Sequence, residues 1–521
     1  MPAALAGIII CLPVIMVLAA GLLDGGGAAW THIQDNLLAR YLSGTLFMLG
    51  LTGALCLLFA VPAAWLVTMF RFPGRGVFEW LLILPLAAPG YVLAFAWADL
   101  GSVSGPIQTG LRDATGWSAR DYWFPAISSL PGLSFVLACT LYPYVYLTAR
   151  AAFVSQSVCT LEAARSLGAG PSRTFFSVAL PAARPAIAAG LALALMEAAA
   201  DYGAAEFLGV PTLTYGIVRA WKSFGEPAAA ARLAFILIAV IAVLIVTERA
   251  ARGRAGIQQS SSRWRDIPRV PLKGAKAAGA VIFCTLLFLF AFAFPVSRLV
   301  WRSLEVGRGS APVFDALLNS VMLAGAGAAF AFVLALLIAL AARAKSPAAL
   351  FARASAVSGY AIPGAVLALG ALAVIAGTPF TLSGGVALVA LAWVYAARFT
   401  AAGTEPMTAA LARAPASMGQ AARSLGAGPA RRALAVDLPV AMSGAAASAL
   451  ILFVEALKEL PATLMLRPFN WDTLAVRAFA YASDERLAAA ALPSLMITLA
   501  GLGPVILLSW QLSRARPGAA P

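Results

Sequence analysis

Continuous apolar runs of about 20 residues recur along the chain, and they constrain its fold more than any other feature. Runs of this length are typical of helices that cross a bilayer, whereas transmembrane β-strands are about half as long and alternate. Only 11% of the 521 residues are charged, against roughly 25% in a soluble protein. The sequence therefore argues against a large soluble helical protein and predicts an all-α polytopic membrane protein.

These runs predict twelve transmembrane helices in two sets of six. The stretch Arg249–Lys276 between the sets is basic and Ser-rich, so it cannot cross a bilayer. We expect a first half at 1–250, a cytoplasmic linker at 251–275 and a second half at 276–521. No small-residue cleavage site follows the first run, so we interpret it as a retained span. The predicted spans are Leu5–Leu23, Thr45–Phe70, Val77–Ala98, Leu133–Ala149, Ala186–Ala205, Arg232–Thr247, Ala277–Val296, Leu317–Ala342, Ala354–Ala376, Gly384–Ala397, Ala441–Ala456 and Ala488–Gln511.

One polar stretch occurs twice, as Glu162–Pro181 and Gln420–Pro439, and the segments Ala163–Pro171 and Ala421–Pro429 are identical. A repeat in polar loops is not explained by shared hydrophobicity, so it indicates two copies of one unit that present the same surface. Each copy predicts a short helix ended by a glycine, a turn, and a second helix that starts at a proline. We expect Pro181 and Pro439 to end the second helix.

Basic residues set the orientation of the predicted spans. Most Lys and Arg fall in the linker, in both repeated stretches and in the other loops that a cytoplasmic N-terminus would place inside. Both termini are then cytoplasmic, and six spans per half give two parallel six-helix repeats. An alternative interpretation of the repeated stretch is an interfacial loop with its arginines on lipid headgroups. That alternative explains the arginines but not the identical Gly-Ala-Gly-Pro turn.

Two further features recur in both halves. Pro89-Gly90 and Pro363-Gly364 open similar segments, and we expect helix kinks at both because proline removes a backbone hydrogen bond. Four acidic residues fall in or beside the fifth spans, where carboxylates are costly and indicate function. They either line the substrate path, where hard oxygen ligands would suit Fe³⁺, or form a gate or a structural pair with residues such as Lys458. These candidates are Glu197, Asp201, Glu455 and Glu459.

The repeated stretch resembles the signature loop of permease subunits of bacterial ABC importers. That pattern is Glu-Ala-Ala, three residues, Gly, nine residues, an aliphatic residue, one residue and Leu-Pro. The first copy fits it throughout, and the second departs only at Gln420. The resemblance implies coupling helices that dock on ATPase subunits, less strongly in the second copy, where a charge is missing. The residues concerned are Glu162, Ala163, Ala164, Arg165, Gly168, Pro181, Gln420, Ala421, Ala422, Arg423, Gly426 and Pro439.

Later segments are similar to those of the fused two-half permeases for ferric iron. They are Asp201–Gly203, Phe207–Thr214, Lys458–Leu464 and Tyr481–Glu485. The resemblance implies the type I ABC importer permease fold and favours ferric iron as substrate. Relatives that transport thiamine, polyamines or other small solutes share much of this pattern, so those substrates stay open.

The chain contains no Gly-Lys dipeptide and hence no P-loop, so it predicts a non-catalytic permease without a cofactor of its own. ATP and Mg would be bound by two copies of a separate ATPase subunit, and a periplasmic or secreted binding protein would deliver substrate. One histidine and scattered cysteines predict no metal site. We expect a bacterial inner membrane protein that binds no nucleic acid. An ion-coupled secondary transporter is the alternative from another class, although it would be expected to show inverted repeats.

Overall fold

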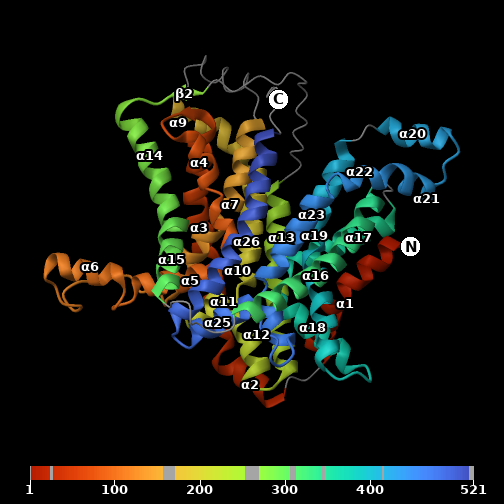
Figure 1. Ribbon diagram of the computed structural model, residues 1–521, viewed down its shortest axis with the longest axis horizontal. Helices are drawn as coiled ribbons and strands as arrows, with labels where there is room; N and C mark the ends of the chain where they lie inside the picture. Colours follow the sequence, from red (N-terminus) through yellow and green to blue (C-terminus); the bar gives the residue numbers. More distant parts are fainter. Residues whose placement is uncertain are drawn as a thin grey trace. The chain divides into compact units, whose positions relative to one another are not determined.

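The computed structural model describes residues 2–23, 27–155, 170–252, 269–305, 313–342, 346–413 and 416–514 (Figure 1). Within these ranges almost every element is a helix, and the strands β1 (Phe70–Arg71) and β2 (Val270–Pro271) form one short parallel pair. The predicted all-α polytopic fold is confirmed. Nine described helices are long and apolar enough to cross a membrane, or up to twelve spans if each sharply bent pair counts as one.

All twelve predicted spans overlap these helices, but three of them are broken rather than straight, and the predicted span Ala186–Ala205 runs past a helix that ends at Ala200. The bent pairs are Arg75–Ala87 with Gly90–Thr115 (98°), Pro347–Ala361 with Gly364–Ala376 (114°) and Ala430–Met442 with Ala445–Lys458 (66°). At the first two breaks a proline in extended backbone conformation precedes the glycine that opens the next helix. Because proline also disfavours helical backbone in the residue before it, the chain turns sharply there.

The described helices form two compact units that group the chain differently from the two sequence halves. Unit 1 comprises Met1–Leu42, Pro211–Ile238 and Ser303–Pro504, and unit 2 comprises Ser43–Val210, Ala239–Arg302 and Val505–Pro521. Each unit therefore contains most of one predicted half together with the first span of the other half. The boundaries 1–250, 251–275 and 276–521 stay a prediction about the repeat.

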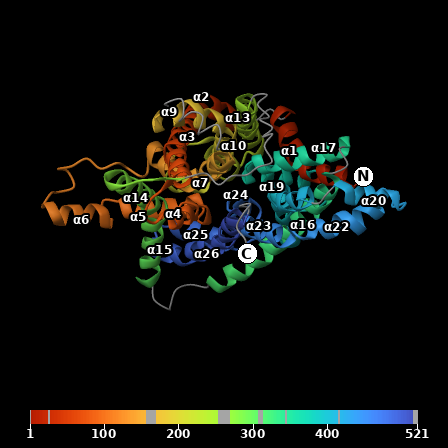
Figure 2. The same cartoon turned by 90° about the horizontal axis from the view of Figure 1, so that it is seen from above.

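Helices α16 and α19 pack together in unit 1, and α1 lies along α17 and α18 (Figures 1 and 2). Glycines permit this close approach, since a Cβ on Gly7 would lie 2.7 Å from the ring of Phe351. The helices are α1 (Pro2–Leu23), α2 (Gly27–Asn36), α12 (Leu213–Lys222), the start of α13 (Pro227–Arg252), α16 (Val313–Ala342), α17 (Pro347–Ala361), α18 (Gly364–Ala376), α19 (Gly384–Arg413), α20 (Ala416–Ser424), α21 (Pro429–Arg432), η4 (Ala433–Asp437), α22 (Leu438–Met442), α23 (Ala445–Lys458), α24 (Pro461–Leu466), α25 (Leu474–Ser483) and most of α26 (Leu487–Arg514).

In unit 2, helix α7 packs against α10 and α5 against α11, while α6 projects away from the other helices of this unit (Figures 1 and 2). The end of the predicted linker is tied to the loop after α3, because Leu272 N–H donates to Arg71 O at 2.9 Å beside the strand pair. The helices are α3 (Leu38–Met69), α4 (Arg75–Leu81), η1 (Leu84–Ala87), α5 (Gly90–Gly101), α6 (Pro106–Thr115), α7 (Leu130–Ser155), α9 (Pro171–Thr174), η2 (Phe175–Ala179), α10 (Leu180–Ala200), α11 (Gly203–Phe207), α14 (Gly274–Phe288), η3 (Leu289–Ala293) and α15 (Phe294–Glu305).

Candidate functional site

The second copy of the repeated stretch forms a helix, a turn and a second helix, α20 and α21, which project from unit 1 (Figure 1). Gly426 ends the first helix with φ of +77°, a left-handed conformation that favours glycine. The turn is closed by Ala427 N–H, which donates to Ala422 O at 2.9 Å. Gln420 and Ala421 are exposed on α20, and Arg423 lies in its last turn. Part of the surface that the sequence predicts to dock is therefore exposed in this copy.

The first copy is visible only at its end. Glu162, Ala163, Ala164, Arg165 and Gly168 lie outside the described residues, so their docking role stays a prediction. The described chain resumes at residue 170 and enters α9, and Pro181 lies in the first turn of α10.

The expectation that Pro181 and Pro439 end a helix is wrong. In both copies the helix widens into a π-helical segment, η2 and η4, and then continues through the Leu-Pro pair. A proline ring would clash with the carbonyl four residues earlier in an α-helix, and a wider turn removes that clash. The same arrangement precedes Pro295 after η3, whereas other prolines inside described helices, such as Pro13 and Pro62, follow no π-helical segment.

The second copy also buries an acidic residue that the first copy lacks. Asp437 is fully buried at the end of η4, and Arg432 Nε donates to its Oδ2 at 3.2 Å. The residues at the same positions of the first copy are Thr174 and Ala179. The two copies thus share their backbone path but not their polar contacts.

Glu459, one of the four predicted carboxylates, lies just past the end of α23 and is almost completely buried, with its side chain 1% exposed. Its carboxylate accepts hydrogen bonds from Ala462 N–H and Thr463 N–H at the start of α24, and from Arg398 Nη1 at 3.1 Å. A Cβ on Gly364 would collide with its Oε1. Glu459 therefore sits at the starts of two helices, α18 and α24, where the helix dipoles favour a negative charge.

Asp201 takes the corresponding position in unit 2, just past the end of α10. Its Oδ1 accepts from Ala204 N–H at 2.8 Å, in the first turn of α11. A Cβ on Gly90 would lie 2.9 Å from Asp201 Oδ2 and 3.2 Å from the side chain of Leu137. The structure thus brings together two features that the sequence predicted separately, since a carboxylate lies against the glycine of each Pro-Gly break.

The other two predicted carboxylates, Glu197 and Glu455, are less buried than Glu459. Glu455 accepts from Lys458 Nζ at 3.2 Å on the same helix and its side chain is 28% exposed. Glu197 is half-buried on α10. Among the described residues, no three His, Cys, Asp or Glu side chains are grouped closely enough to hold a metal ion.

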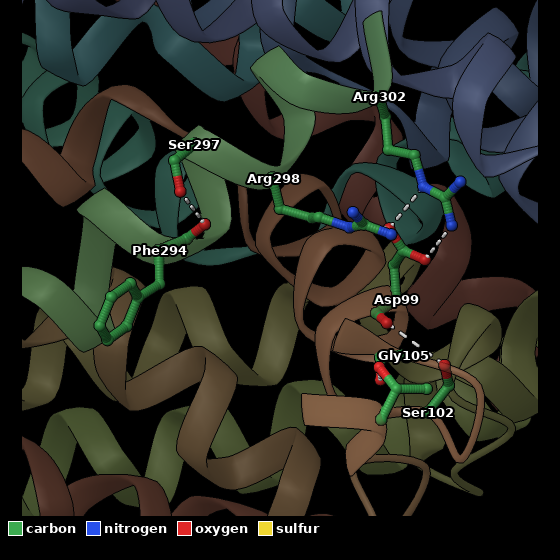
Figure 3. Close-up of polar contacts among 8 residues, drawn as sticks. Asp99, Ser102, Gly105, Phe294, Ser297, Arg298 and Arg302 are labelled. Carbon is green, nitrogen blue, oxygen red and sulfur yellow. Dashed lines mark hydrogen bonds and ion pairs between the residues drawn. The ribbon is translucent and has the colours of Figure 1, made fainter. Parts of the chain in front are cut away.

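Sequence reasoning missed a cluster at the far end of α5. Figure 3 shows Asp99 facing Arg298 and Arg302, which lie one turn apart on α15. Arg302 donates to both carboxylate oxygens of Asp99, at 2.7 and 2.9 Å, and Arg298 Nε donates at 2.6 Å. The side chain of Asp99 is 6% exposed. The only signal in the sequence was an isolated acid in an apolar run, and its partners are about two hundred residues away.

Charged side chains also join α4 to α7 in unit 2. Glu79 on α4 accepts from Arg75 Nη2 at 3.1 Å on the same helix and from Arg150 on α7. Arg75 Nε also donates to Val67 O at 2.6 Å. Arg75 and Arg150 lie in the predicted loops that the charge pattern places in the cytoplasm, and both form ion pairs within the protein.

Comparison with known proteins places this geometry in a family. Residues 57–252 match the model of the binding-protein-dependent transport system inner membrane component. An Fe(3+)-transport system permease protein of Haemophilus influenzae is 24% identical over 511 residues, which cover 97% of this chain and 96% of the relative. A molybdenum transport system permease protein of Escherichia coli K12 is 30% identical over 220 residues, which are 39% of this chain and 92% of the relative.

A sulfate transport system permease protein of Escherichia coli K12 is 28% identical over 204 residues, which are 38% of this chain and 70% of the relative. The molybdenum and sulfate relatives thus cover less than half of this chain, whereas the Fe(3+) relative covers nearly all of it. Together with the helical fold and the exposed helix pair, these similarities show that the chain belongs to the family of binding-protein-dependent transport system inner membrane components, the permease subunits of ABC importers.

Proposed function

We propose that the chain forms the substrate pathway of an importer driven by two separate ATPase subunits, which dock on loops 162–181 and 420–439 at the cytoplasmic face. The observation that carries this proposal is the duplicated loop, whose described copy is an exposed helix pair on a projecting end of unit 1. A surface made twice in one chain fits two copies of one partner. A periplasmic binding protein would deliver the substrate at the opposite face.

Movement of the docked ATPase has a continuous route into unit 1. The second docking helix runs through η4 and α22, bends by 66°, and continues as α23. Helix α23 ends just before Glu459, whose carboxylate accepts a hydrogen bond at the start of α24 and lies against Gly364 at the start of α18. We infer that displacement of α20 and α21 is transmitted to the Pro363-Gly364 break, where a short helix can change its angle.

The four predicted carboxylates fit a gate or structural pair better than substrate ligands. Glu459 already accepts hydrogen bonds from two backbone N–H groups and Arg398, and it is nearly inaccessible. Glu455 pairs with Lys458. Alternating access would then depend on how Asp201 and Glu459 hold the two breaks, without a direct bond from either carboxylate to the transported ion.

Ferric iron is the substrate that we propose. Its support is the similarity across both halves to a Fe(3+)-transport permease, and it rests on no ligand geometry in this chain. Related permeases transport thiamine, polyamines and oxyanions, so the test must compare the uptake of these solutes with the uptake of ferric iron. We expect proteoliposomes containing the chain, its ATPase and its binding protein to accumulate radiolabelled ferric ion, and not molybdate, sulfate, spermidine or thiamine. Preferential uptake of one of those solutes would contradict the proposal and would identify that solute as the substrate.

The docking role is tested by a pair of glycines in the second loop. A Cβ would meet no atom within 4 Å at Gly426 or at Gly428, but only Gly426 has a positive φ. Gly426→Val should therefore distort the turn and abolish ATPase binding at this loop, and transport with it, whereas Gly428→Val is the matched control. Both variants should insert and fold. Normal ATPase binding by Gly426→Val would contradict the docking role, and uptake without any ATPase would favour the secondary transporter.

A further inference from the structure

A cavity of about 570 Å³ lies within unit 1, between α1, the end of α12, the start of α13, and α18. Its thirteen lining residues are all hydrophobic, and they include Met16, Val17, Trp221, Leu369 and Ala373. The described carboxylates and arginines do not line it, so it offers nothing to the polar ions and solutes considered as substrates. Its volume falls within the range of small-molecule sites, about 300–1,000 Å³.

Close helix contacts on two sides explain why the cavity exists. A Cβ on Gly370 of α18 would collide with the backbone of Pro13 on α1. Further along α1, a Cβ on Gly21 would lie 2.9 Å from Ala231 O on α13. These two crossings fix α1 against both neighbours, and the small side chains between them, such as Ala20 and Ala228, do not fill the space.

The cavity opens toward the surface of unit 1. Leu23 is exposed at its edge, at 83%, and Met16 and Ala20 are partly exposed. Two of its walls, α1 and α13, are helices of a length and composition that cross a membrane, so hydrocarbon chains surround them. Water would find no polar partners in such a site, whereas a hydrocarbon chain would gain dispersion contacts.

Polar and aromatic groups lie at the same end of unit 1, which is opposite α20 and α21 (Figure 1). Lys222 follows the lining residue Trp221 and is exposed. Arg232 follows the lining residue Ala231, and its guanidinium lies 5.2 Å from the ring centre of Trp30. Arg232 lies near the start of the spanning helix α13, and Lys222 and Trp30 lie on the short helices α12 and α2. Trp, Lys and Arg near the ends of spans are typical of the level of the lipid headgroups.

We propose that this cavity binds one acyl chain of a membrane phospholipid, whose phosphate lies beside Lys222 and Arg232. The lipid comes from the leaflet opposite the docking helices. It fills the space between α1 and α18, and so it completes the packing of the helix that follows the Pro363-Gly364 break.

The first experiment fills the cavity. Ala373→Trp places a bulky side chain on its wall, and Ile8→Trp, at a position of α1 that is 53% exposed, is the matched control. Native mass spectrometry of the full chain should show one tightly retained phospholipid in the wild type and in Ile8→Trp. Retention in Ala373→Trp should be at least about ten-fold weaker, since loss of two buried CH₂ groups has this effect. Undiminished retention by a folded Ala373→Trp would overturn the proposal.

A second experiment needs no variant, so it holds even if Ala373→Trp fails to fold. Wild-type chain in nanodiscs is irradiated with a phosphatidylglycerol that carries a diazirine at the middle of one acyl chain. Cross-links should concentrate on the peptides that contain residues 16–23 and 369–376, and Lys222→Glu should reduce them several-fold relative to Lys273→Glu. Cross-links spread evenly over lipid-exposed helices, or retention of detergent only, would overturn the proposal.

Discussion

The short helices α5 and α18 follow the two Pro-Gly breaks, and a buried ion cluster lies at a different end of each helix. In unit 1 the cluster is at the start of α18, where Glu459 meets Arg398. In unit 2 it is at the end of α5, where Asp99 meets Arg298 and Arg302. Counting from the Pro-Gly pair, the residue of α18 that corresponds to Asp99 is Ala373, which lines the cavity.

This difference shows what duplication kept and what it did not keep. Both units retain the break, the carboxylate against its glycine, and the first span of the other half packed near the short helix. The second neighbour of the glycine differs between the units. Leu137 lies beside Gly90 in unit 2, whereas Arg398 lies beside Gly364 in unit 1. Glu459 is almost completely buried and has a counter-charge, as a buried carboxylate requires, whereas Asp201 is only half-buried.

The largest effect is expected from Arg398→Leu, which gives unit 1 the apolar neighbour of unit 2. Glu459 would then be buried without its cation, at a cost of about 3–5 kcal/mol in the free energy of unfolding. The double variant Arg398→Leu/Glu459→Gln should recover most of this loss, because no buried charge remains. Thermal unfolding of the purified variants in nanodiscs measures both, and a double variant as unstable as the single one would show that the ion pair is not the cause.

Variants of Asp99 test the ion cluster of unit 2, at the end of α5. Asp99→Ala should cost about 1.5–3 kcal/mol, the value for hydrogen bonds to charged groups, because Arg298 and Arg302 are partly exposed and can be solvated. Asp99→Asn should lie between this variant and the wild type. Asp113→Ala, an exposed acid on α6, is the control in the same unfolding measurement. Equal stability of Asp99→Ala and the control would mean that α15 is held on α5 by apolar packing alone.

The glycines of the two breaks should differ in a smaller way. Gly364→Ala places a methyl group on a fully held carboxylate and should cost about 1–3 kcal/mol, as overpacking does. Gly90→Ala should cost less, because its added Cβ would lie 2.9 Å from the nearest atom, Asp201 Oδ2, instead of colliding with a carboxylate oxygen. Gly325→Ala and Gly50→Ala are helical controls with no atom within 4 Å of the added Cβ. The ranking is read from melting temperatures, and a more destabilising Gly90→Ala would show that the closer contact, at Gly364, does not decide the cost.

The fold class and the breaks were predictable because apolar run length and Pro-Gly pairs act locally. The equivalence of Asp201 and Glu459 was also predictable, since both follow the repeated loop at one spacing. Their partners were not, because Arg398 is 61 residues from Glu459 and any of several arginines could have reached it. The exchange of first spans between the units left no trace in the sequence, because all spans are similarly apolar.

The smallest effect concerns the two docking loops. Gln420 stands where the first copy has Glu162, and it is exposed on α20. Gln420→Glu would restore a charge-assisted hydrogen bond and should tighten ATPase binding at this loop by about 1 kcal/mol, which is roughly five-fold in affinity. Titration of the ATPase onto nanodisc-bound chain measures this, and Gln420→Met, which cannot form the bond, should weaken binding instead. If Gln420→Glu and Gln420→Met bind the ATPase equally, the side chain at this position makes no contact with the partner and the two loops dock alike.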